Sequence, residues 1–260
     1  MKKVILIVRK EWTEVIRNRL LLFSVFLVPV LLVAIPLLML HLTGAEEVPA
    51  EEVEMYYRVA PQLAGLAPNE VMQVIIVSQF LFMFLMMPLF IPMTIASFSI
   101  IGEKQQRSLE PLLATPITVG ELLLGKSLAA AIPAVLTTWL AFGIFALGAW
   151  FLATPPVRPL LVNLMWLLAM LIIAPLCCLL SVALAVIVSS RVNDVRVAEQ
   201  IAGFIIIPLV GFSLLQVAGK VFYTTRAFAI AAVVLALLDV IALYVGVRLF
   251  QREEILTRWR

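Results

Sequence analysis

Residues 102–127 read GEKQQRSLEPLLATPITVGELLLGKS, and they separate two long apolar runs, residues 71–101 and 128–152. The first run has 31 residues, which exceeds the roughly 20 that an α-helix needs to cross a bilayer. Both runs are therefore predicted to span a membrane. The polar stretch between them is predicted to lie in water at one membrane face, and the rest of the chain follows the same pattern.

The composition excludes an ordinary soluble domain. Of the 260 residues, 63% are apolar and 13% are charged, whereas soluble domains have roughly 45–50% apolar and about 25% charged residues. The apolar runs are continuous and lack the alternation of a transmembrane β-barrel. We therefore predict an all-α polytopic membrane protein in which residues 1–260 form a single transmembrane domain. The six predicted spans cover approximately residues 20–42, 71–101, 128–152, 160–188, 201–218 and 227–249.

Two segments outside the spans have a distinct character. Residues 1–19 carry six basic side chains, while apolar residues such as Val4, Val8 and Trp12 recur at helical spacing. This pattern predicts an amphipathic helix that lies in the membrane interface and contacts lipid. Residues 43–70 contain six acids and one base. They are predicted to form an acidic extracytoplasmic loop, which is either a solvated outer face or a vestibule that attracts cations.

The distribution of lysine and arginine predicts the orientation in the membrane. Six spans place both termini on the same side. Fifteen basic residues lie in the two terminal segments and in the loops 102–127 and 189–200, whereas four lie in the segments of the opposite side. By the positive-inside rule, the chain is predicted to be a multi-pass protein of the cell membrane with both termini and the stretch 102–127 in the cytoplasm.

The end of the stretch matches the pattern of a nucleotide-binding phosphate loop. Residues 120–127 read GELLLGKS, which satisfies Gly, four residues, Gly, Lys, Ser or Thr. A working loop needs small residues around the phosphates and a buried strand before it. Here three leucines favour a helix that continues into the bilayer. We therefore interpret Lys126 as a lysine that snorkels towards lipid headgroups, and Gly125 as a position of close helix packing.

The stretch also carries a series of motifs in a fixed order. They are Gly102-Glu103, Leu109-Glu110, Leu112-Leu113-Ala114-Thr115-Pro116, Glu121-Leu122 and Gly125-Lys126. This order resembles the loop between the second and third spans of type-2 ABC transporter permeases, the exporter family that includes drug, polysaccharide and sodium exporters. The segment 10–19 is similar to the amino-terminal interfacial helix of the family. Two departures are Arg107-Ser108, where Gly-Thr is usual, and Pro111, where an apolar helix former is more common.

The resemblance implies a permease that exports its substrate by alternating access. Its loop would form a cytoplasmic coupling helix that docks on a separate ABC ATPase subunit, with two permeases, either two copies or two different chains, and two ATPases in the complex. ATP and Mg²⁺ would bind on the partner, so this chain would have no catalytic residues and no cofactor. The expected ATPase contacts are Glu103, Arg107, Glu110, Leu112 and Leu113. A second contact is expected in the loop 189–200, at Asn193, Asp194 and Arg196.

Two further residues inside the spans are candidates for a substrate or ion path. Asp239 lies near the middle of the last span, where an acid costs about 2.5–3.5 kcal/mol on insertion scales. It is either an ion or proton site or, as we expect, it forms hydrogen bonds to hydroxyls or amides of neighbouring helices. Trp139, in the third span, either lines a path or fills a helix interface, and we expect packing. The adjacent Cys177 and Cys178 suggest neither a disulfide framework nor a metal site.

Two alternative functions remain open at the level of sequence. The chain could be an ion-coupled secondary transporter or channel that uses Asp239, or a membrane scaffold that recruits a cytoplasmic partner through residues 102–127. Nucleic acid is not an expected partner, because the net charge of +3 is small. Association with an ATPase subunit separates the first hypothesis from these two.

Overall fold

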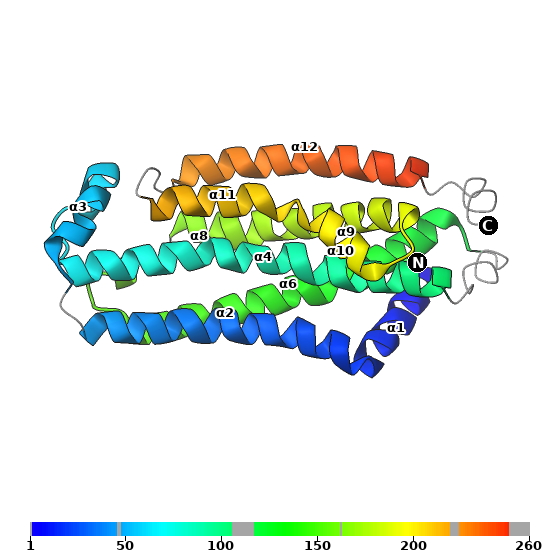
Figure 1. Cartoon of the computed structure of the whole chain (residues 1–260), viewed down its shortest axis with the longest axis horizontal. Helices are drawn as coiled ribbons and strands as arrows, with labels where there is room; N and C mark the ends of the chain where they lie inside the picture. Colours follow the sequence, from blue (N-terminus) through cyan, green and yellow to red (C-terminus); the bar gives the residue numbers. More distant parts are fainter. Residues whose placement is uncertain (1, 46–47, 106–116, 162, 219–223, 250–260) are drawn as a thin grey trace.

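The computed structural model describes residues 2–45, 48–105, 117–161, 163–218 and 224–249, and every regular element among them is a helix. The long helices run side by side along the long axis of the molecule, and α2 and α12 lie on opposite sides of the bundle (Figure 1). In chain order, the elements are α1 (Lys2–Arg17), α2 (Arg19–Ala45), α3 (Ala50–Val59), η1 (Pro61–Leu63), α4 (Pro68–Gln105), α6 (Val119–Leu152), α7 (Arg158–Leu161), α8 (Leu164–Leu168), η2 (Ala169–Ile173), α9 (Ala174–Arg191), α10 (Val195–Gly203), α11 (Ile206–Val217) and α12 (Thr225–Leu249).

The predicted fold class, an all-α polytopic membrane protein, is confirmed. Five helical segments among the described residues are long and apolar enough to cross a membrane, and α10 with α11 makes a sixth if this bent pair is counted as one span. The two helices of the pair meet at 42°, directly after Gly203. The sequence had predicted an interrupted apolar segment here, and glycine favours such a break because it weakens helix continuation.

α4 is the centre of the bundle. In the most apolar 18-residue stretch of α4, 71% of the residues are buried, whereas in the corresponding stretch of α12 the share is 17%. α4 packs against α2, α6, α9, α10 and α11. A helix that is apolar on all sides is stable only when other helices or lipid surround it, and α4 is surrounded by helices. A movement of either end of α4 would therefore affect the helices that pack against it.

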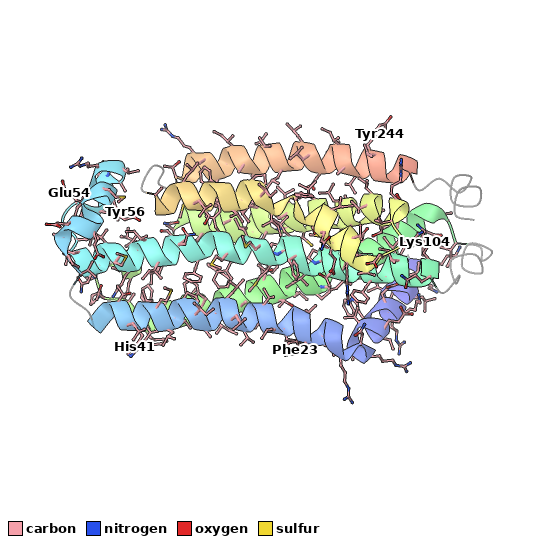
Figure 2. The ribbon with its side chains drawn as sticks, viewed as in Figure 1. Phe23, His41, Glu54, Tyr56, Lys104 and Tyr244 are labelled. Carbon is pink, nitrogen blue, oxygen red and sulfur yellow. The ribbon has the colours of Figure 1, made fainter. Side chains whose placement is uncertain are left out.

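α2 and α12 present apolar side chains outwards. Phe23 on α2 and Tyr244 on α12 extend away from the bundle in Figure 2, and Leu38, Leu237 and Val240 are also exposed. Large exposed apolar faces mark contact with a membrane or another protein. In a bundle with several spanning helices, these faces fit a lipid environment.

The fourth predicted span, residues 160–188, is built from several helical pieces. A five-residue π-turn, η2, precedes Pro175, which has no N–H to donate to the carbonyl one turn earlier. The indole Nε1 of Trp139 on α6 donates to the carbonyl of Met170 in this turn, at 2.7 Å. Trp139 therefore satisfies a backbone group of the irregular turn, as neighbouring helices do in membrane bundles.

The predicted acidic loop, residues 43–70, contains more regular structure than expected, since α3 and η1 form within it. Val53 and Tyr56 are buried, and the hydroxyl of Tyr57 donates to the carbonyl of Leu66 at 2.9 Å. The helix was not predicted because the acids of α3, which lie on its exposed face, give this segment the composition of a solvated loop. α3 lies across the end of the bundle that is opposite α1 (Figure 1).

Candidate functional site

The end of the bundle at which α1 lies is called here the N-terminal end. The last residue of α4, the first of α6, the junction of α9 with α10 and the last residue of α12 also lie there (Figure 1). These are the helix ends that flank the segments with excess lysine and arginine. The structure thus places the amino-terminal segment and the flanks of both predicted docking loops at one end of the molecule.

α1 crosses α6 at very short range. The indole Nε1 of Trp12 donates to the carbonyl of Ala129 at 3.0 Å. A β-carbon placed on Gly125 would lie 2.8 Å from Cβ and Cγ2 of Ile7. The predicted role of Gly125 in close packing is therefore confirmed, and the helix that it admits is α1.

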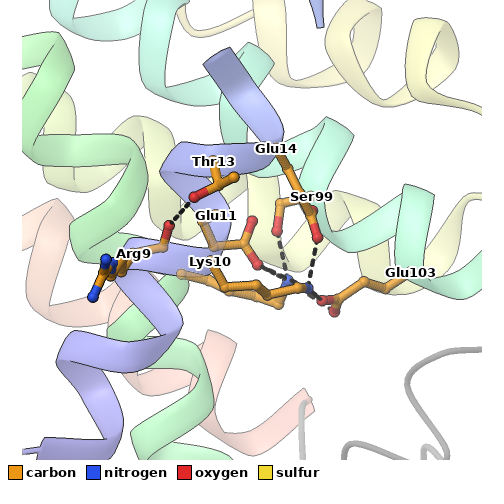
Figure 3. Close-up of polar contacts among 8 residues, drawn as sticks. Arg9, Lys10, Glu11, Thr13, Glu14, Ser99 and Glu103 are labelled. Atoms are coloured by element: carbon orange, nitrogen blue, oxygen red, sulfur yellow. Dashed lines mark hydrogen bonds and ion pairs between the residues drawn. The ribbon is translucent and has the colours of Figure 1, made fainter. Parts of the chain in front are cut away.

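Near this crossing, five side chains form what we call the charge cluster: Lys10, Glu11, Ser99, Glu103 and Lys126. Figure 3 labels the first four. Nζ of Lys126 lies 2.8 Å from Oε1 of Glu11, 2.8 Å from Oε2 of Glu103 and 2.5 Å from the hydroxyl of Ser99. Lys10 pairs with Glu103 and lies 3.5 Å from Glu11. The cluster joins α1, α4 and α6.

The geometry of the cluster balances its charges inside the protein. The side chain of Glu11 is 2% exposed and that of Lys126 is 3% exposed. Buried charges are tolerated when they are paired and hydrogen-bonded. A lysine ammonium has three N–H donors, and Lys126 has three acceptors within reach. The two lysines and two glutamates of the cluster carry no net charge together, and Lys10 also lies 3.3 Å from the exposed Glu14.

The surroundings of α1 shift two pKa values in opposite directions. Burial raises the pKa of the Glu11 carboxyl, but Lys126, Ser99 and Lys10 outweigh burial and hold this pKa below its ordinary value. Burial lowers the pKa of Lys10, whereas the hydrogen bond and charge of Glu103, with Glu11 and Glu14, raise it overall. Both groups are therefore held in their charged forms at neutral pH.

Acidification is expected to weaken the cluster through Glu11. A lowered carboxyl pKa contributes stability that is present above the ordinary value of 4.5 and is lost as the pH falls through the folded-state value. The raised pKa of Lys10 acts only at alkaline pH. Unfolding in detergent between about pH 7 and about pH 3 should show that Glu11→Gln loses less stability than the wild type. Glu51→Gln, at an exposed position of α3 at the opposite end of the bundle, should behave like the wild type; equal acid sensitivity in Glu11→Gln would contradict the assignment.

The interpretation of Lys126 as a snorkelling lysine is wrong. Its ammonium group points into the protein, where α1 covers it and Glu11 provides the counter-charge. The sequence of α6 alone places a lysine at the mouth of a span, where lipid headgroups are the default partner. Which partner it has depends on where α1 lies, and a local pattern does not contain that information.

The residues of the apparent phosphate loop form part of a regular helix. α6 begins at Val119, before the first glycine of the pattern, and continues without interruption through Ser127. A capping box starts it: the Thr118 hydroxyl accepts from the Glu121 N–H at 3.2 Å, and the Thr118 N–H donates to Glu121 Oε2 at 3.0 Å. The prediction that the leucines continue a helix is confirmed, and no backbone cradle for phosphates is formed here.

The end of α4 contacts the segment between α9 and α10, where the second ATPase contact is predicted. Nζ of Lys104 donates to the carbonyl of Val192 at 3.2 Å, and Nε2 of Gln105 donates to that of Asn193 at 2.9 Å. Lys104 is visible at this end in Figure 2. Asp194 caps α10 by accepting from the N–H of Arg196 at 2.7 Å. Asn193, Asp194 and Arg196 are exposed.

The remaining predicted contacts are placed differently. Glu103 is buried in the charge cluster and so positions α4 instead of presenting its carboxylate at the surface. Arg107, Glu110, Leu112 and Leu113, together with most of the predicted coupling helix, lie outside the described residues. A cleft of about 560 Å³ opens beside the cluster, between α1, α4 and the start of α10. Its walls include Glu14, Arg17, Gly102 and Gln105.

Sequence reasoning missed Lys10, Glu11 and Ser99 as members of a site. One signal was available: Glu11 falls on the same helical face as Val4, Val8 and Val15, among apolar residues that were predicted to face the membrane. An acid on an apolar face and a lysine at the start of an apolar span need counter-charges. Their pairing is only evident when both helices are placed.

Asp239 differs from the expectation of a hydrogen-bonded acid. Its side chain is buried on α12, and neither carboxylate oxygen has a hydrogen-bond partner among the described residues. Two of the three hydroxyls of the neighbouring α9 bond to backbone carbonyls: Ser181 donates to Leu89 on α4, and Ser190 donates to Ile187. Neither of these hydroxyls bonds to the acid.

Comparison with known protein families identifies a match over most of the chain. A sequence model whose description is "ABC-2 family transporter protein" matches residues 5–241. The matched region begins within α1, contains the whole charge cluster and ends within α12. No curated protein matches the chain.

Proposed function

This chain belongs to the ABC-2 family of transporter proteins, as a membrane component of an ABC transporter, and from that premise we propose that it is the permease of an ATP-driven exporter. ATP and Mg²⁺ bind on a separate cytoplasmic ATPase subunit. Two permeases and two ATPases form the working complex. The substrate crosses by alternating access between inward-facing and outward-facing arrangements of the helices.

The charge cluster is the observation that carries this proposal. Lys126 on α6 holds Glu103 on α4 and Glu11 on α1 within 2.8 Å each. α4 and α6 are the helices on either side of the loop 106–118, so a force applied to this loop reaches three helices together. Packed and hydrogen-bonded contacts of this kind move as a unit. Such an arrangement suits a loop through which a partner moves the bundle.

The junction of α9 and α10 is the second part of the proposed docking surface. Lys104 and Gln105 bond to its backbone at Val192 and Asn193, which keeps the short connection between the two helices beside the end of α4. A partner bound at the N-terminal end would touch both. In the proposed orientation, this end faces the cytoplasm, as the excess of lysine and arginine near it favours.

Charge reversal in the docking loop is expected to weaken association with the ATPase subunit. Arg107→Glu combined with Glu110→Arg should lower the affinity by about tenfold or more, because charged pairs at an interface determine partner choice. The measurement is co-purification, and titration of the reconstituted permease with the ATPase subunit that co-purifies with it. Arg58→Glu, at the opposite end of the bundle, is the matched control and should bind like the wild type.

The same preparation distinguishes the alternative functions. An ion-coupled transporter in vesicles would use an ion gradient to move its substrate, and a channel would let its substrate pass down the substrate's own gradient. Neither would need an ATPase. A scaffold would bind its partner but would neither transport nor stimulate ATP hydrolysis. Export that needs both the ATPase and ATP is the expected result, and transport by the permease alone would contradict the proposal.

A further inference from the structure

A second site lies within the apolar length of the bundle. A pocket of about 380 Å³ lies between α4, α9, α11 and α12. It opens to the outside of the bundle, because Val234 and Leu238 line it and are themselves partly exposed. Its volume falls within the range of small-molecule sites, about 300–1,000 Å³. In a membrane, a molecule would enter this pocket from the lipid.

One wall of the pocket is aromatic. The ring of Phe82 on α4 lies 5.5 Å from that of Phe212 on α11 and 5.6 Å from that of Phe228 on α12, measured between centroids. The remaining walls are mostly aliphatic, with the thiol of Cys177 as a weakly polar group. Such walls bind an apolar body, and ring faces also attract a cationic group. A sugar or another strongly polar ligand would lose its hydrogen bonds to water here.

Asp239 lies beside this pocket but is not one of its lining residues; it interacts electrostatically with Cys177, which lines the pocket. The face of α12 that lines the pocket passes through Phe228 and Leu235, and Asp239 is one helical turn beyond Leu235 and adjacent to Leu238. The side chain is 4% exposed, and neither oxygen has a hydrogen-bond partner among the described residues. A buried carboxylate without a partner is unfavourable. It therefore needs a ligand, a proton or a counter-ion.

In the part of the chain that the structure describes, no basic side chain pairs with Asp239. The titratable side chains that interact with it from α9 are the thiols of Cys177 and Cys178. α8 and η2, which also pack against α12, contain no titratable side chain. Among the described residues, no three histidine, cysteine, aspartate or glutamate side chains gather as metal ligands. An organic cation therefore fits the pocket beside Asp239 better than a metal ion, which needs several oxygen ligands.

We propose that the pocket between α4, α9, α11 and α12 binds lipophilic organic cations, with their apolar groups against Phe82, Phe212 and Phe228 and their positive charge balanced by Asp239. The inference rests on the proposed exporter function and names its substrate class. Because the carboxylate is shielded from water, its pairing with a dehydrated cation is strong. The site selects for a positive charge on an apolar body.

Binding of tetraphenylphosphonium to the full-length permease in phosphatidylcholine nanodiscs tests this site. The expected result is saturable binding of the labelled cation, and much weaker binding of tetraphenylborate, an anion of the same shape. Asp239→Asn, which keeps the shape and removes the charge, should weaken the cation by about tenfold or more. Asp239→Glu keeps the charge and should retain most of the affinity.

A second pair of variants tests the pocket itself. Ala231 lines the pocket, whereas Ala229, two residues earlier on α12, does not. Ala231→Trp should fill the mouth and abolish binding, and Ala229→Trp should bind like the wild type. Thermal unfolding of each variant shows whether it is folded.

Three results would overturn the assignment: equal binding of cation and anion, unchanged affinity in folded Asp239→Asn, or no saturable binding above empty nanodiscs. The assay contains neither ATPase nor ATP. A failure here, with ATPase association intact, removes only the substrate class. Loss of ATPase association with intact cation binding removes only the proposed coupling.

Discussion

Lys126→Met is expected to lower the free energy of unfolding by about 3–5 kcal/mol, because it leaves a buried ion pair without one of its partners. Among the described residues, Lys10 would then be the cation that pairs with both Glu11 and Glu103. A net negative charge would remain inside the protein. The hydrogen bonds to Glu11 and Ser99 and the ion pair with Glu103 would be lost together. Unfolding of the purified protein by SDS in mixed micelles, followed by tryptophan fluorescence, measures the change.

Two further variants isolate the buried charge as the cause. Arg58→Met removes an exposed pair with Glu54 and is expected to change stability by about 1 kcal/mol or less. Adding Glu11→Gln to Lys126→Met restores neutrality around Lys10 and Glu103, so the double variant should be more stable than Lys126→Met alone. If Lys126→Met were as mild as Arg58→Met, the charge cluster would not hold these helices together.

Gly125→Ala is expected to destabilise the protein by about 1–3 kcal/mol, the usual result of adding a group to a well-packed contact. The new methyl group would lie 2.8 Å from both Cβ and Cγ2 of Ile7. Cβ is fixed to the backbone, so a rotamer change of Ile7 cannot relieve the clash, and α1 itself must move. Displacement of α1 would also separate Glu11 from Lys126. The same unfolding assay measures the loss.

Two other glycines serve as matched controls. Gly120→Ala, in the first turn of the same helix, meets no atom within 4 Å and should be neutral or stabilising by about 0.5–1 kcal/mol. At Gly148, the nearest atoms are the terminal methyl groups of Leu37, which can turn aside, so Gly148→Ala should cost less than Gly125→Ala. Equal effects at positions 120 and 125 would show that α1 is not tightly held.

Lys126→Met and Gly125→Ala are also expected to change function. If the ATPase subunit acts through the loop between α4 and α6, then a folded variant with a loosened cluster should still bind ATPase but should couple hydrolysis to export less efficiently. A docking variant such as Arg107→Glu with Glu110→Arg should lose binding itself. The two classes therefore separate attachment of the partner from transmission of its movement.

The fold class and most of the helices could be predicted from the sequence because hydropathy is a local property. The apolar run from residue 128 to 152 specifies a span whatever surrounds it, since a bilayer requires backbone hydrogen bonds within each segment. The helical character of residues 120–127 was also local, because three leucines and a capping threonine favour a helix at that position. The short helix α3 escaped prediction because only a few of its side chains are buried.

The partners of the charged residues were decided by tertiary structure alone. Glu11 and Lys126 are 115 residues apart in the chain, and their pairing depends on how α1 and α6 cross and rotate about their axes. Hydropathy places a charge at a certain depth but does not say which helix faces it. For the same reason, the sequence located Asp239 within a span, and only the packing of α9 and α12 left its carboxylate beside an apolar pocket without a hydrogen-bond partner among the described residues.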